Sequence, residues 1–359
     1  MNGQSAEDRI RDIANIAEKY LGKPGFADKF YDYMSKGYYS LATPIWTNYG
    51  LTRGLPISCF SSYIADDMSR ILYTHAEVGM MTKYGGGTAG HFAEVRPRGA
   101  VIDGNGHSSG SVHFMELFDN LINIVSQGTV RRGHFAPYLP VEHDDIEEFL
   151  NIGKEGHPIQ ESTYAVTVTD KWLQDMIDGD QDKRRIWAKI IQRRTEIGYP
   201  YILFSDTVNN NTVNVYRDKK MKIHGSNLCS EICLPTSDEI SFVCCLSSLN
   251  LRHYQQWKDT DAVETLTMFL DTVIQEFVDR LESYCDSTDP HRQSAFYFMQ
   301  RAHKFAKEHR ALGLGVLNKF LEGWAGAVLA KIMVLVFIVV FIQKRPQGLF
   351  AMKGRSAEA

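Results

Sequence analysis

Apolar and polar residues alternate along most of the chain with the spacing of helices and strands. At the N-terminus, Ser5 and Asp8 form a capping pattern ahead of apolar residues at helical spacing, so we expect a helix that ends near Gly22. The longest helical pattern covers residues 261–285, and residues 294–308 continue in the same style. The apolar face of this longest pattern consists of Val263, Leu266, Leu270, Val273, Phe277 and Leu281.

Strand-like and helix-like segments alternate in the middle of the chain. Residues 40–110 are rich in Gly, Pro and Ser, with short apolar pieces such as 59–64, a pattern typical of short buried strands and long functional loops. Further along, the expected elements are a strand at 164–169, helices at 171–177 and 185–197, and a strand at 199–204. This alternation favours an α/β fold with parallel strands.

The last segment differs from everything before it. Residues 332–342 carry no charge, and the wider stretch 324–342 contains Lys331 as its one charged residue. The stretch is long enough for a marginal transmembrane helix, and the four basic residues between 344 and 355 would place the C-terminus on the cytoplasmic side. A buried core helix is the alternative, because Lys331 interrupts a short apolar run.

Composition narrows the class of protein. Of the 359 residues, 44% are hydrophobic and 23% are charged, which indicates a globular chain, and a net charge of -4 argues against a nucleic-acid partner. Six cysteines occur behind a polar N-terminus that lacks a secretory signal, so we expect a reducing, cytoplasmic compartment. There, clustered cysteines are more often catalytic or metal-binding than structural disulfides.

Candidate chemistry lies in the run Asn227-Leu228-Cys229-Ser230-Glu231. Cys229 and Glu231 are two residues apart, so an extended backbone points both side chains to the same side, together with Asn227. A thiol becomes reactive through one-electron oxidation or a lowered pKa, and a carboxylate shielded from water gains a pKa suited to general acid and base work. Cys59 and Cys244 come from distant segments and could meet as a dithiol that supplies two electrons.

Three other interpretations compete at these residues. Considered by itself, Cys59 would be interpreted as a small hydrophobic residue in the core. A zinc site is disfavoured because adjacent cysteines rarely make good tetrahedral partners and the C-x2-C spacing is absent; its ligands would be Cys229, Cys233, Cys244 and Cys245. The glycines of 85–90 have the spacing of a dinucleotide-binding turn, but the residues before them look helical rather than strand-like.

Six ordered motifs resemble class I ribonucleotide reductase large subunits over about residues 29–316. These motifs are Leu41 to Ile45, Ser58-Cys59, Gly85 to Gly90, Ser126 to Gly133, Asn227 to Thr236, and Cys244 to Leu251. The resemblance implies part of a ten-stranded α/β barrel, whose two antiparallel halves are five-stranded parallel sheets around a central loop that carries Cys229. We therefore expect an N-terminal helical segment at 1–40, a partial barrel at 41–316 and a hydrophobic helical tail at 317–359.

The resemblance also implies a role for each matching residue. Cys229 would carry a transient thiyl radical that takes the ribose 3′-hydrogen, Glu231 would act as base for the 3′-hydroxyl, and Asn227 would hydrogen-bond the ribose. Cys59 and Cys244 would form the dithiol that reduces the 2′ carbon as water leaves. The expected activity is the reduction of ribonucleoside diphosphates to deoxyribonucleoside diphosphates.

Further residues are expected to bind substrate or effector. Thr43 and Ser58 would touch the substrate. Asp66 and the loops 95–106 and 126–133 would correspond to the allosteric specificity site, where a bound deoxynucleotide or ATP selects the substrate. The charged candidates in these loops are Arg96, Arg98, Arg131 and Arg132. Arg131 and Arg132 place fixed positive charge in a Gly-flanked segment, which suits phosphate or base contact; a solvated charged turn is the alternative.

The resemblance implies partners but no metal or other cofactor bound by this chain itself. A small subunit that contains a metal would supply the radical, thioredoxin or glutaredoxin would be the reductant, and the large subunit would be a homodimer. The family's N-terminal ATP-binding cone has no counterpart before Met1, so control of overall activity by ATP and dATP is expected to be missing. The second half of the barrel would have to come from a complementing C-terminal half.

The tail suggests a second hypothesis. Residues 317–359, and 343–350 above all, resemble the C-terminal end of an ABC-transporter permease of the urea or branched-chain amino-acid type. The alternative to a reductase is therefore an inactive truncated or hybrid protein, tethered to a membrane through residues 324–342.

Overall fold

The computed structural model describes residues 4–308, so the predictions for residues 317–359 lie outside the described residues. The chain begins with α1 (Ala6–Leu21), where the Ser5 side chain accepts a hydrogen bond from Asp8 N and the Asp8 side chain accepts one from Ser5 N. The helix ends at Gly22 in the left-handed conformation. The capping pattern read from the sequence is therefore confirmed.

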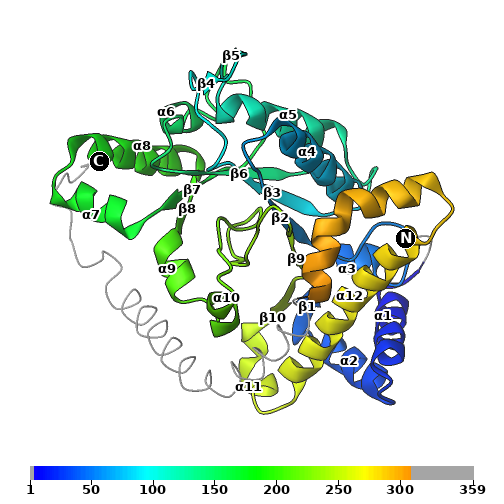
Figure 1. Cartoon of the computed structure of the whole chain (residues 1–359). Helices are drawn as coiled ribbons and strands as arrows, with labels where there is room; N and C mark the ends of the chain where they lie inside the picture. The colour runs from blue at the N-terminus through cyan, green and yellow to red at the C-terminus, as the bar shows by residue number, and fades with distance from the viewer. Residues whose placement is uncertain (1–3, 309–359) are drawn as a thin grey trace, which may run out of the picture. The chain divides into compact units, whose positions relative to one another are not determined.

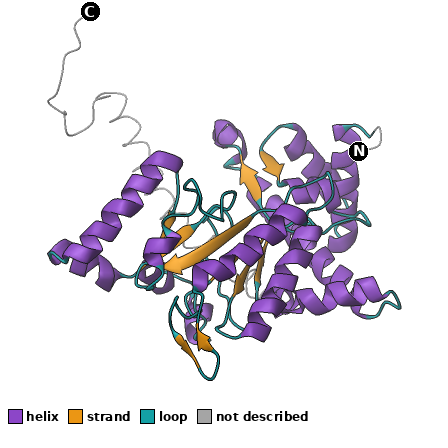
Figure 2. Ribbon diagram, turned by 90° about the horizontal axis from the view of Figure 1, so that it is seen from above, coloured by secondary structure: helices purple, strands orange, loops and turns teal. Residues whose placement is uncertain are grey.

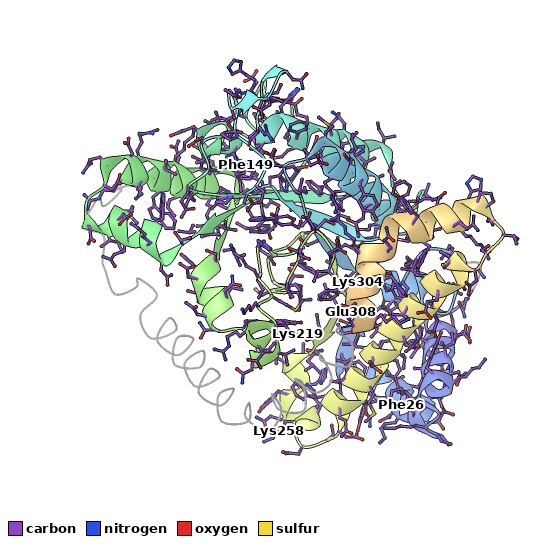
Figure 3. All side chains as sticks on the ribbon, viewed as in Figure 1. Phe26, Phe149, Lys219, Lys258, Lys304 and Glu308 are labelled. Atoms are coloured by element: carbon purple, nitrogen blue, oxygen red, sulfur yellow. The ribbon has the colours of Figure 1, made fainter. Side chains whose placement is uncertain are left out.

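A helical layer forms around α1, α2 (Phe26–Ser35) and α12 (Ala262–Cys285). Their apolar faces share one core cluster, to which Phe26, labelled in Figure 3, belongs. The side chain of Arg9 is buried and donates to the backbone oxygens of Ile45, Trp46 and Tyr49, at the end of α3 (Thr43–Asn48). Through these three backbone oxygens, Arg9 connects α1 to the C-terminal part of α3.

The central feature is a six-stranded sheet in the order β8-β7-β6-β3-β2-β9. Neighbouring strands from β8 to β2 are parallel, whereas β9 pairs with β2 in the antiparallel sense. The predicted α/β fold with parallel strands is confirmed, with β9 as an antiparallel addition. The strands are β2 (Cys59–Tyr63), β3 (Gly87–His91), β6 (Phe135–Pro140), β7 (Ala165–Val168), β8 (Tyr201–Phe204) and β9 (Phe242–Cys244).

Helices cover the outer face of the sheet. Figure 1 shows α4 (Met68–Lys83) and α5 (Ser111–Ile124) lying along it, and Figure 2 shows helices packed beside the strands. Phe118 of α5 stacks on Phe135 of β6, with ring centroids 5.1 Å apart. The same core cluster includes Phe149 of α6 (Ile146–Phe149), labelled in Figure 3.

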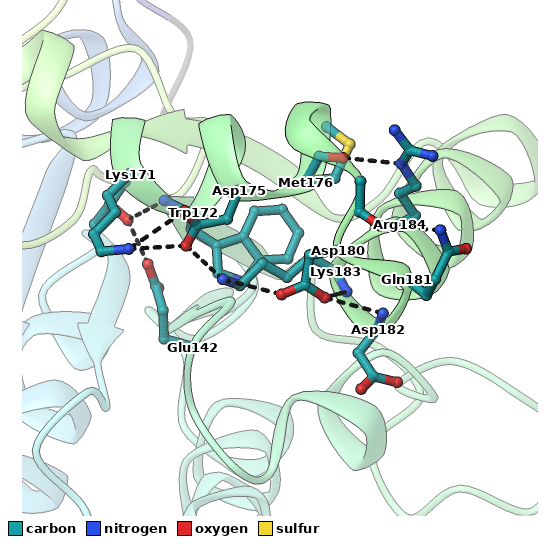
Figure 4. A network of polar contacts seen from close by, with 12 residues as sticks. Glu142, Lys171, Trp172, Asp175, Met176, Asp180, Gln181, Asp182, Lys183 and Arg184 are labelled. Carbon is teal, nitrogen blue, oxygen red and sulfur yellow. Dashed lines mark hydrogen bonds and ion pairs between the residues drawn. The ribbon is translucent and has the colours of Figure 1, made fainter.

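Two helices follow β7 as a hairpin, α7 (Asp170–Asp178) and α8 (Gln181–Ile197). Gly179 turns the chain in the left-handed conformation, and Asp180 then caps α8 by accepting from Asp182 N and Lys183 N. Lys183 Nζ lies 2.6 Å from a carboxylate oxygen of Asp175, which joins the two helices (Figure 4). These contacts explain why the break between the two helical patterns becomes a tight turn.

The helix of residues 290–308 is fixed to the sheet by a buried ion pair. Arg301 pairs with Glu77 of α4, and both side chains are almost wholly buried. Glu77 also accepts hydrogen bonds from Ser62 of β2 and from Ser241, at 2.9 and 3.1 Å. The pair therefore joins α4, β2 and this helix.

The smaller elements connect these layers. β1 (Tyr39–Leu41) pairs with β10 (Ser247–Leu249), and β4 (Val101–Ile102) pairs with β5 (Gly106–His107). Short helices occupy other connections: α9 (Ser205–Asn210), α10 (Asn214–Asp218), α11 (Tyr254–Trp257) and a 3₁₀ turn at Leu251–His253.

The inner face of the sheet carries small side chains, which leaves room for a loop. Gly87, Ala89, Ala136 and Ala165 occupy neighbouring strands, and the three alanines belong to one buried cluster against which Leu228 packs. A Cβ on Gly87 would lie 2.9 Å from Leu228 Cδ2. Figure 1 shows the loop between α10 and β9 on this side of the strands. The curled sheet and its central loop form part of an α/β barrel, as the resemblance implied.

Within residues 4–308, no helix combines the length and the apolar character that crossing a membrane requires. The predicted membrane segment, 324–342, lies outside this range.

Candidate thiol site

Two of the predicted thiols lie next to each other at the edge of the sheet. Cys59 is the first residue of β2 and Cys244 is the last residue of β9, and the two are direct partners in the antiparallel register. Opposed side chains in such a pair point to the same face of the sheet. Both cysteines are free thiols. The register thus places the two distant segments side by side.

The central loop reaches this pair through Asn227. Its side-chain nitrogen donates to Cys59 Sγ at 3.3 Å, and the asparagine is fully buried. Its side-chain oxygen accepts from the backbone nitrogens of Glu231 and Ile232, both at 3.1 Å. These contacts occupy the side chain of Asn227 with the loop and with Cys59.

A tyrosine of the sheet supports the same loop. The hydroxyl of Tyr138 in β6 donates to the backbone oxygen of Asn227 at 2.7 Å and lies 2.6 Å from Ser230 Oγ. Ser230 has a φ of 65°, a left-handed conformation that non-glycine residues adopt rarely. Ser226 adds a further contact by donating to Ile232 O at 2.6 Å. The backbone on either side of Cys229 is thus fixed by buried hydrogen bonds.

Cys229 and Glu231 lie on the exposed side of this loop. Both side chains are exposed, unlike Asn227 and Cys59. Partial burial and then the nearby carboxylate of Glu231 raise the pKa of Cys229, while Arg131 lowers it by a smaller amount. The raised pKa leaves little of the accessible Cys229 as thiolate at neutral pH, so its nucleophilicity there is low.

Burial dominates the acidity of the cross-strand pair. Burial raises the pKa of Cys59 to about 11, against a smaller lowering by the hydrogen bond from Asn227. Burial also raises the pKa of Cys244 well above its ordinary value, and the neighbouring thiols Cys245 and Cys59 add to the effect. The adjacent Cys245 contacts the backbone oxygen of Leu270 at 3.7 Å, toward α12 rather than toward Cys59. Cys244 is therefore the better partner of Cys59.

Ser58 and Ala42, the residue before Thr43, both hydrogen-bond the backbone of Leu246, two residues after Cys244. Leu246 N donates to Ser58 Oγ at 3.4 Å, and Leu246 O accepts from Ala42 N at 3.1 Å. Ala42 directly precedes Thr43, whose side chain is exposed at the start of α3. Ser58 is buried, with its backbone nitrogen bonded to Cys244 O. The structure brings Thr43 and Ser58 to the thiol site.

The predicted effector residues lie at opposite ends of the parallel strands, some before the strands begin and some after they end. Arg131 and Arg132 precede β6, at the edge where β2 begins with Cys59. Asp66 and Arg96 follow β2 and β3, so they lie at the other edge, because these strands run parallel. The sequence-based expectation placed all of these residues in one site, and the described geometry separates them into two groups.

The second group surrounds a cavity of about 360 Å³. Arg96 Nε lies 2.7 Å from a carboxylate oxygen of Asp66, and both residues line the cavity with His107 and Ser108. Arg98 does not line the cavity, because its guanidinium forms a bidentate ion pair with the Glu148 carboxylate, with N–O distances of 2.7 and 2.9 Å. Of the predicted arginines in this loop, Arg96 is the one placed to meet a ligand.

The inner face also carries a polar layer that sequence reasoning missed. His91 and His224 have ring centroids 5.5 Å apart, and Tyr63 lies 4.9 Å from His224. Burial lowers the pKa of His91 to about 3 and that of His224 to about 4. His91 and Tyr63 end adjacent parallel strands, so strand alternation was the available signal.

Within residues 4–308, no three His, Cys, Asp or Glu side chains are grouped so that they could hold a metal ion. Cys229, Cys233, Cys244 and Cys245 therefore do not form such a group.

These features define a class of protein: an α/β barrel segment whose central loop brings an exposed thiol to a pair of cross-strand thiols. The family of the ribonucleotide reductase barrel domain matches residues 57–183 and 178–320. The chain belongs to this family of ribonucleotide reductase large-subunit barrel domains.

Individual relatives agree with this assignment. A relative from Frog virus 3 (isolate Goorha), named as a ribonucleoside-diphosphate reductase large subunit, is 35% identical over an alignment of 330 residues, and the match covers 86% of this chain and 54% of the relative. A ribonucleoside-diphosphate reductase subunit alpha of Chlamydia trachomatis is 26% identical and is covered to 33% of its length, over 86% of this chain. The chain thus spans about half or less of the length of these relatives.

A solved structure shows the same fold. The class Id ribonucleotide reductase alpha subunit of Actinobacillus ureae superposes with a TM-score of 0.78 and 51% sequence identity. The match covers 86% of this chain and 56% of that subunit.

Proposed function

We propose that this chain is the thiol-bearing half of a ribonucleoside-diphosphate reductase large subunit. The observation that carries the proposal is the contact between Asn227 and Cys59, because it joins the loop of Cys229 to the cross-strand partners Cys59 and Cys244. Family membership supplies the reaction class, and the arrangement of thiols supplies residues suited to it.

In the proposed reaction, a thiyl radical on Cys229 removes the 3′-hydrogen atom of a ribonucleoside diphosphate. Glu231 accepts the proton of the 3′-hydroxyl, and the 2′-hydroxyl leaves as water. Cys59 and Cys244 supply two electrons and two protons and close to a disulfide, and the 3′-hydrogen then returns from Cys229. The dithiol is thereby oxidised as the ribose is reduced to deoxyribose.

Other parts of the reaction would come from partners. A metal-containing small subunit would generate the radical, a complementing C-terminal half would complete the barrel, and thioredoxin or glutaredoxin would reduce the disulfide. Like other large subunits, the completed protein would form a homodimer. Thr43 and Ser58 are suited to contact the substrate because Ser58 and Ala42, the residue before Thr43, both hydrogen-bond Leu246 in the Cys244 segment.

For effector binding, we propose that Asp66 and Arg96 line the nucleotide site. Arg96 offers a guanidinium beside a cavity of about 360 Å³, which suits the phosphates of a deoxynucleotide or ATP. Arg131 and Arg132 would act from the other edge of the sheet, next to the thiols. Arg98 would have to leave Glu148 to take part.

The deciding experiment combines this chain with the C-terminal half of the Actinobacillus ureae subunit and its small subunit, then measures deoxynucleoside diphosphate formation. We expect product from the wild type and none from Cys229→Ser, while Cys285→Ser, an exposed cysteine at the end of α12, retains activity. Activity that survives Cys229→Ser would refute the radical assignment.

The alternative is an inactive hybrid tethered through residues 324–342, which lie outside the described part of the chain. It predicts no product with any complementing half, together with recovery of the chain in the membrane fraction until residues 317–359 are deleted. The permease resemblance of this tail stays a prediction, because the relatives reported above are all reductases.

A further inference from the structure

The side chain of Gln127 is held in a tight notch at the edge of the thiol site. Its amide nitrogen donates to Asn48 Oδ1 at 2.8 Å, and its amide oxygen accepts from Asn48 Nδ2 at 3.4 Å. Asn48 lies in α3, is fully buried and also donates to Leu55 O at 2.9 Å. The two amides therefore form a reciprocal pair between α3 and the loop 126–133.

Two glycines give this notch its shape. A Cβ on Gly54 would lie 2.3 Å from Gln127 Nε2, and a Cβ on Gly85 would lie 2.2 Å from Gln127 Oε1. Both glycines have positive φ, at 60° and 97°. Any side chain at either position would overlap the glutamine amide, so the absence of a Cβ is what admits Gln127.

Gln127 also closes the turn that carries Arg131. Its backbone nitrogen donates to Arg131 O at 3.1 Å, and its backbone oxygen accepts from Val130 N at 3.0 Å. The backbone of Gln127 therefore closes this turn, while its side chain is held by Asn48. The positive charge of Arg131 acts on the thiols of both Cys59 and Cys229, and lowers the pKa of each.

We propose that Asn48 is a positioning residue, which fixes the turn of Arg131 beside the thiols by holding the side chain of Gln127. Asn48 touches neither thiol, so its influence passes through Gln127 and the turn. The inference rests on the proposed function for the role of the thiols, but not for the geometry that it invokes.

The test uses the reactivity of Cys229 in the full chain of 359 residues, with no partner added. Iodoacetamide modifies thiolates, and peptide mass spectrometry gives the rate for Cys229 alone as a function of pH. A change in the solvent access of Cys229 would change its modification rate by the same factor at every pH. A change in charge near the thiol would instead shift the pH at the midpoint of the rate curve. Glu231 and Arg131 are the charged groups that act on this thiol.

We expect Arg131→Gln to move the midpoint to higher pH and to slow the reaction about two-fold below it, because a stabilising charge is lost. Asn48→Ala should shift the midpoint in the same direction, and the double variant should shift it no further than Arg131→Gln does. A wild-type midpoint in Asn48→Ala, or shifts that add in the double variant, would overturn the proposal.

Gly85→Ala provides a second variant in case Asn48→Ala fails to fold. It forces Gln127 out of the notch while Asn48 remains. Gly156→Ala is the matched control, because Gly156 has a similar φ of 81° and no atom within 4 Å of the added Cβ. We expect the midpoint shift in Gly85→Ala and not in Gly156→Ala, with thermal melting used to confirm that both are folded.

A wild-type midpoint in folded Gly85→Ala would also contradict the proposal. These measurements need neither a radical nor a small subunit. A failed reductase assay would therefore refute the proposed function and leave the role of Asn48 standing, and the reverse also holds.

Discussion

Cys59 lies directly opposite Cys244 across the antiparallel strands β2 and β9. Opposed residues in such strands hold their Cα atoms roughly 4.5–5.5 Å apart, which falls within the range that a disulfide accepts. The two thiols can therefore be joined without moving the backbone far. Burial raises the pKa of both, so few thiolates are present at neutral pH.

We predict that a mild oxidant such as oxidised glutathione joins Cys59 to Cys244, and that the rate rises steadily from pH 7 to pH 9 as thiolate forms. Mass spectrometry of the linked peptides measures the product. Cys59→Ser should abolish the link, and Cys285→Ser should leave it intact. A dominant link between Cys59 and Cys229 would contradict the register as the source of the pairing.

Tyr138→Phe should loosen the central loop. It removes the hydroxyl that contacts Asn227 O and Ser230 Oγ, and leaves that buried carbonyl without this donor. We expect the free energy of unfolding to fall by about 1–3 kcal/mol in urea titrations. Tyr297→Phe, at a side chain that is 55% exposed, is the control and should change little. Equal stabilities of the two variants would mean that this hydroxyl does not support the loop.

Glu77→Ala should be among the most damaging single changes. It leaves the Arg301 guanidinium buried without its carboxylate partner and removes the carboxylate to which Ser62 donates. Removal of one member of a buried pair costs about 3–5 kcal/mol, which denaturant titration would detect. The exposed pair of Lys36 and Asp32 offers a comparison, since Lys36→Ala should leave stability nearly unchanged. Similar losses for the two variants would contradict this role for burial.

Stability should fall on mild acidification because of His91 and His224. Burial lowers the pKa of these two side chains to about 3 and about 4, so both are neutral in the folded protein, whereas in the unfolded chain they take up protons below about pH 6.5. Protonation therefore favours unfolding, and the stability present above pH 6.5 is lost progressively as the pH falls toward 4.

Urea titrations at pH 7 and pH 5 test this point, because most carboxylates stay ionised in that interval. His224→Gln should show a smaller loss between the two pH values than the wild type. Lys222 acts on both histidines and keeps its charge throughout this range, so it does not contribute to the difference. An unchanged loss in His224→Gln would show that other groups set the pH dependence.

The sequence predicted well those helices whose capping residues and apolar spacing lie within the helix itself. The capping pair Ser5 and Asp8 gave the start of α1, and the apolar stripe from Val263 to Leu281 gave α12 nearly to its ends. In contrast, the sixteen-residue helix α4 was anticipated in its last part alone, as the helical residues before Gly85. Glu77 and Thr74 on the buried face of α4 accept hydrogen bonds from Arg301, a residue far along the chain. The buried face of α4 therefore contains polar residues, and its sequence lacks the apolar stripe of an ordinary core helix.

Relations between distant segments required the structure. The register of Cys59 with Cys244 depends on how β9 joins the sheet, and three-residue strands carry too little pattern to specify it. The separation of Arg131 from Arg96 depends on strand direction: one residue precedes a strand and the other follows one. The order of motifs along the chain does not specify at which end of the sheet each residue lies.

The order in which the chain is made gives the pairing of β2 with β9 a further consequence. β2 lies near the start of the sequence and β9 is the last strand of the sheet, so the outer edge of β2 has no partner until almost all of the sheet has been synthesised. At about 5–20 residues per second, that interval lasts on the order of ten to forty seconds. During that interval Cys59 lies on an unpaired strand edge, and Cys244 takes its place opposite Cys59 only when β9 pairs with that edge.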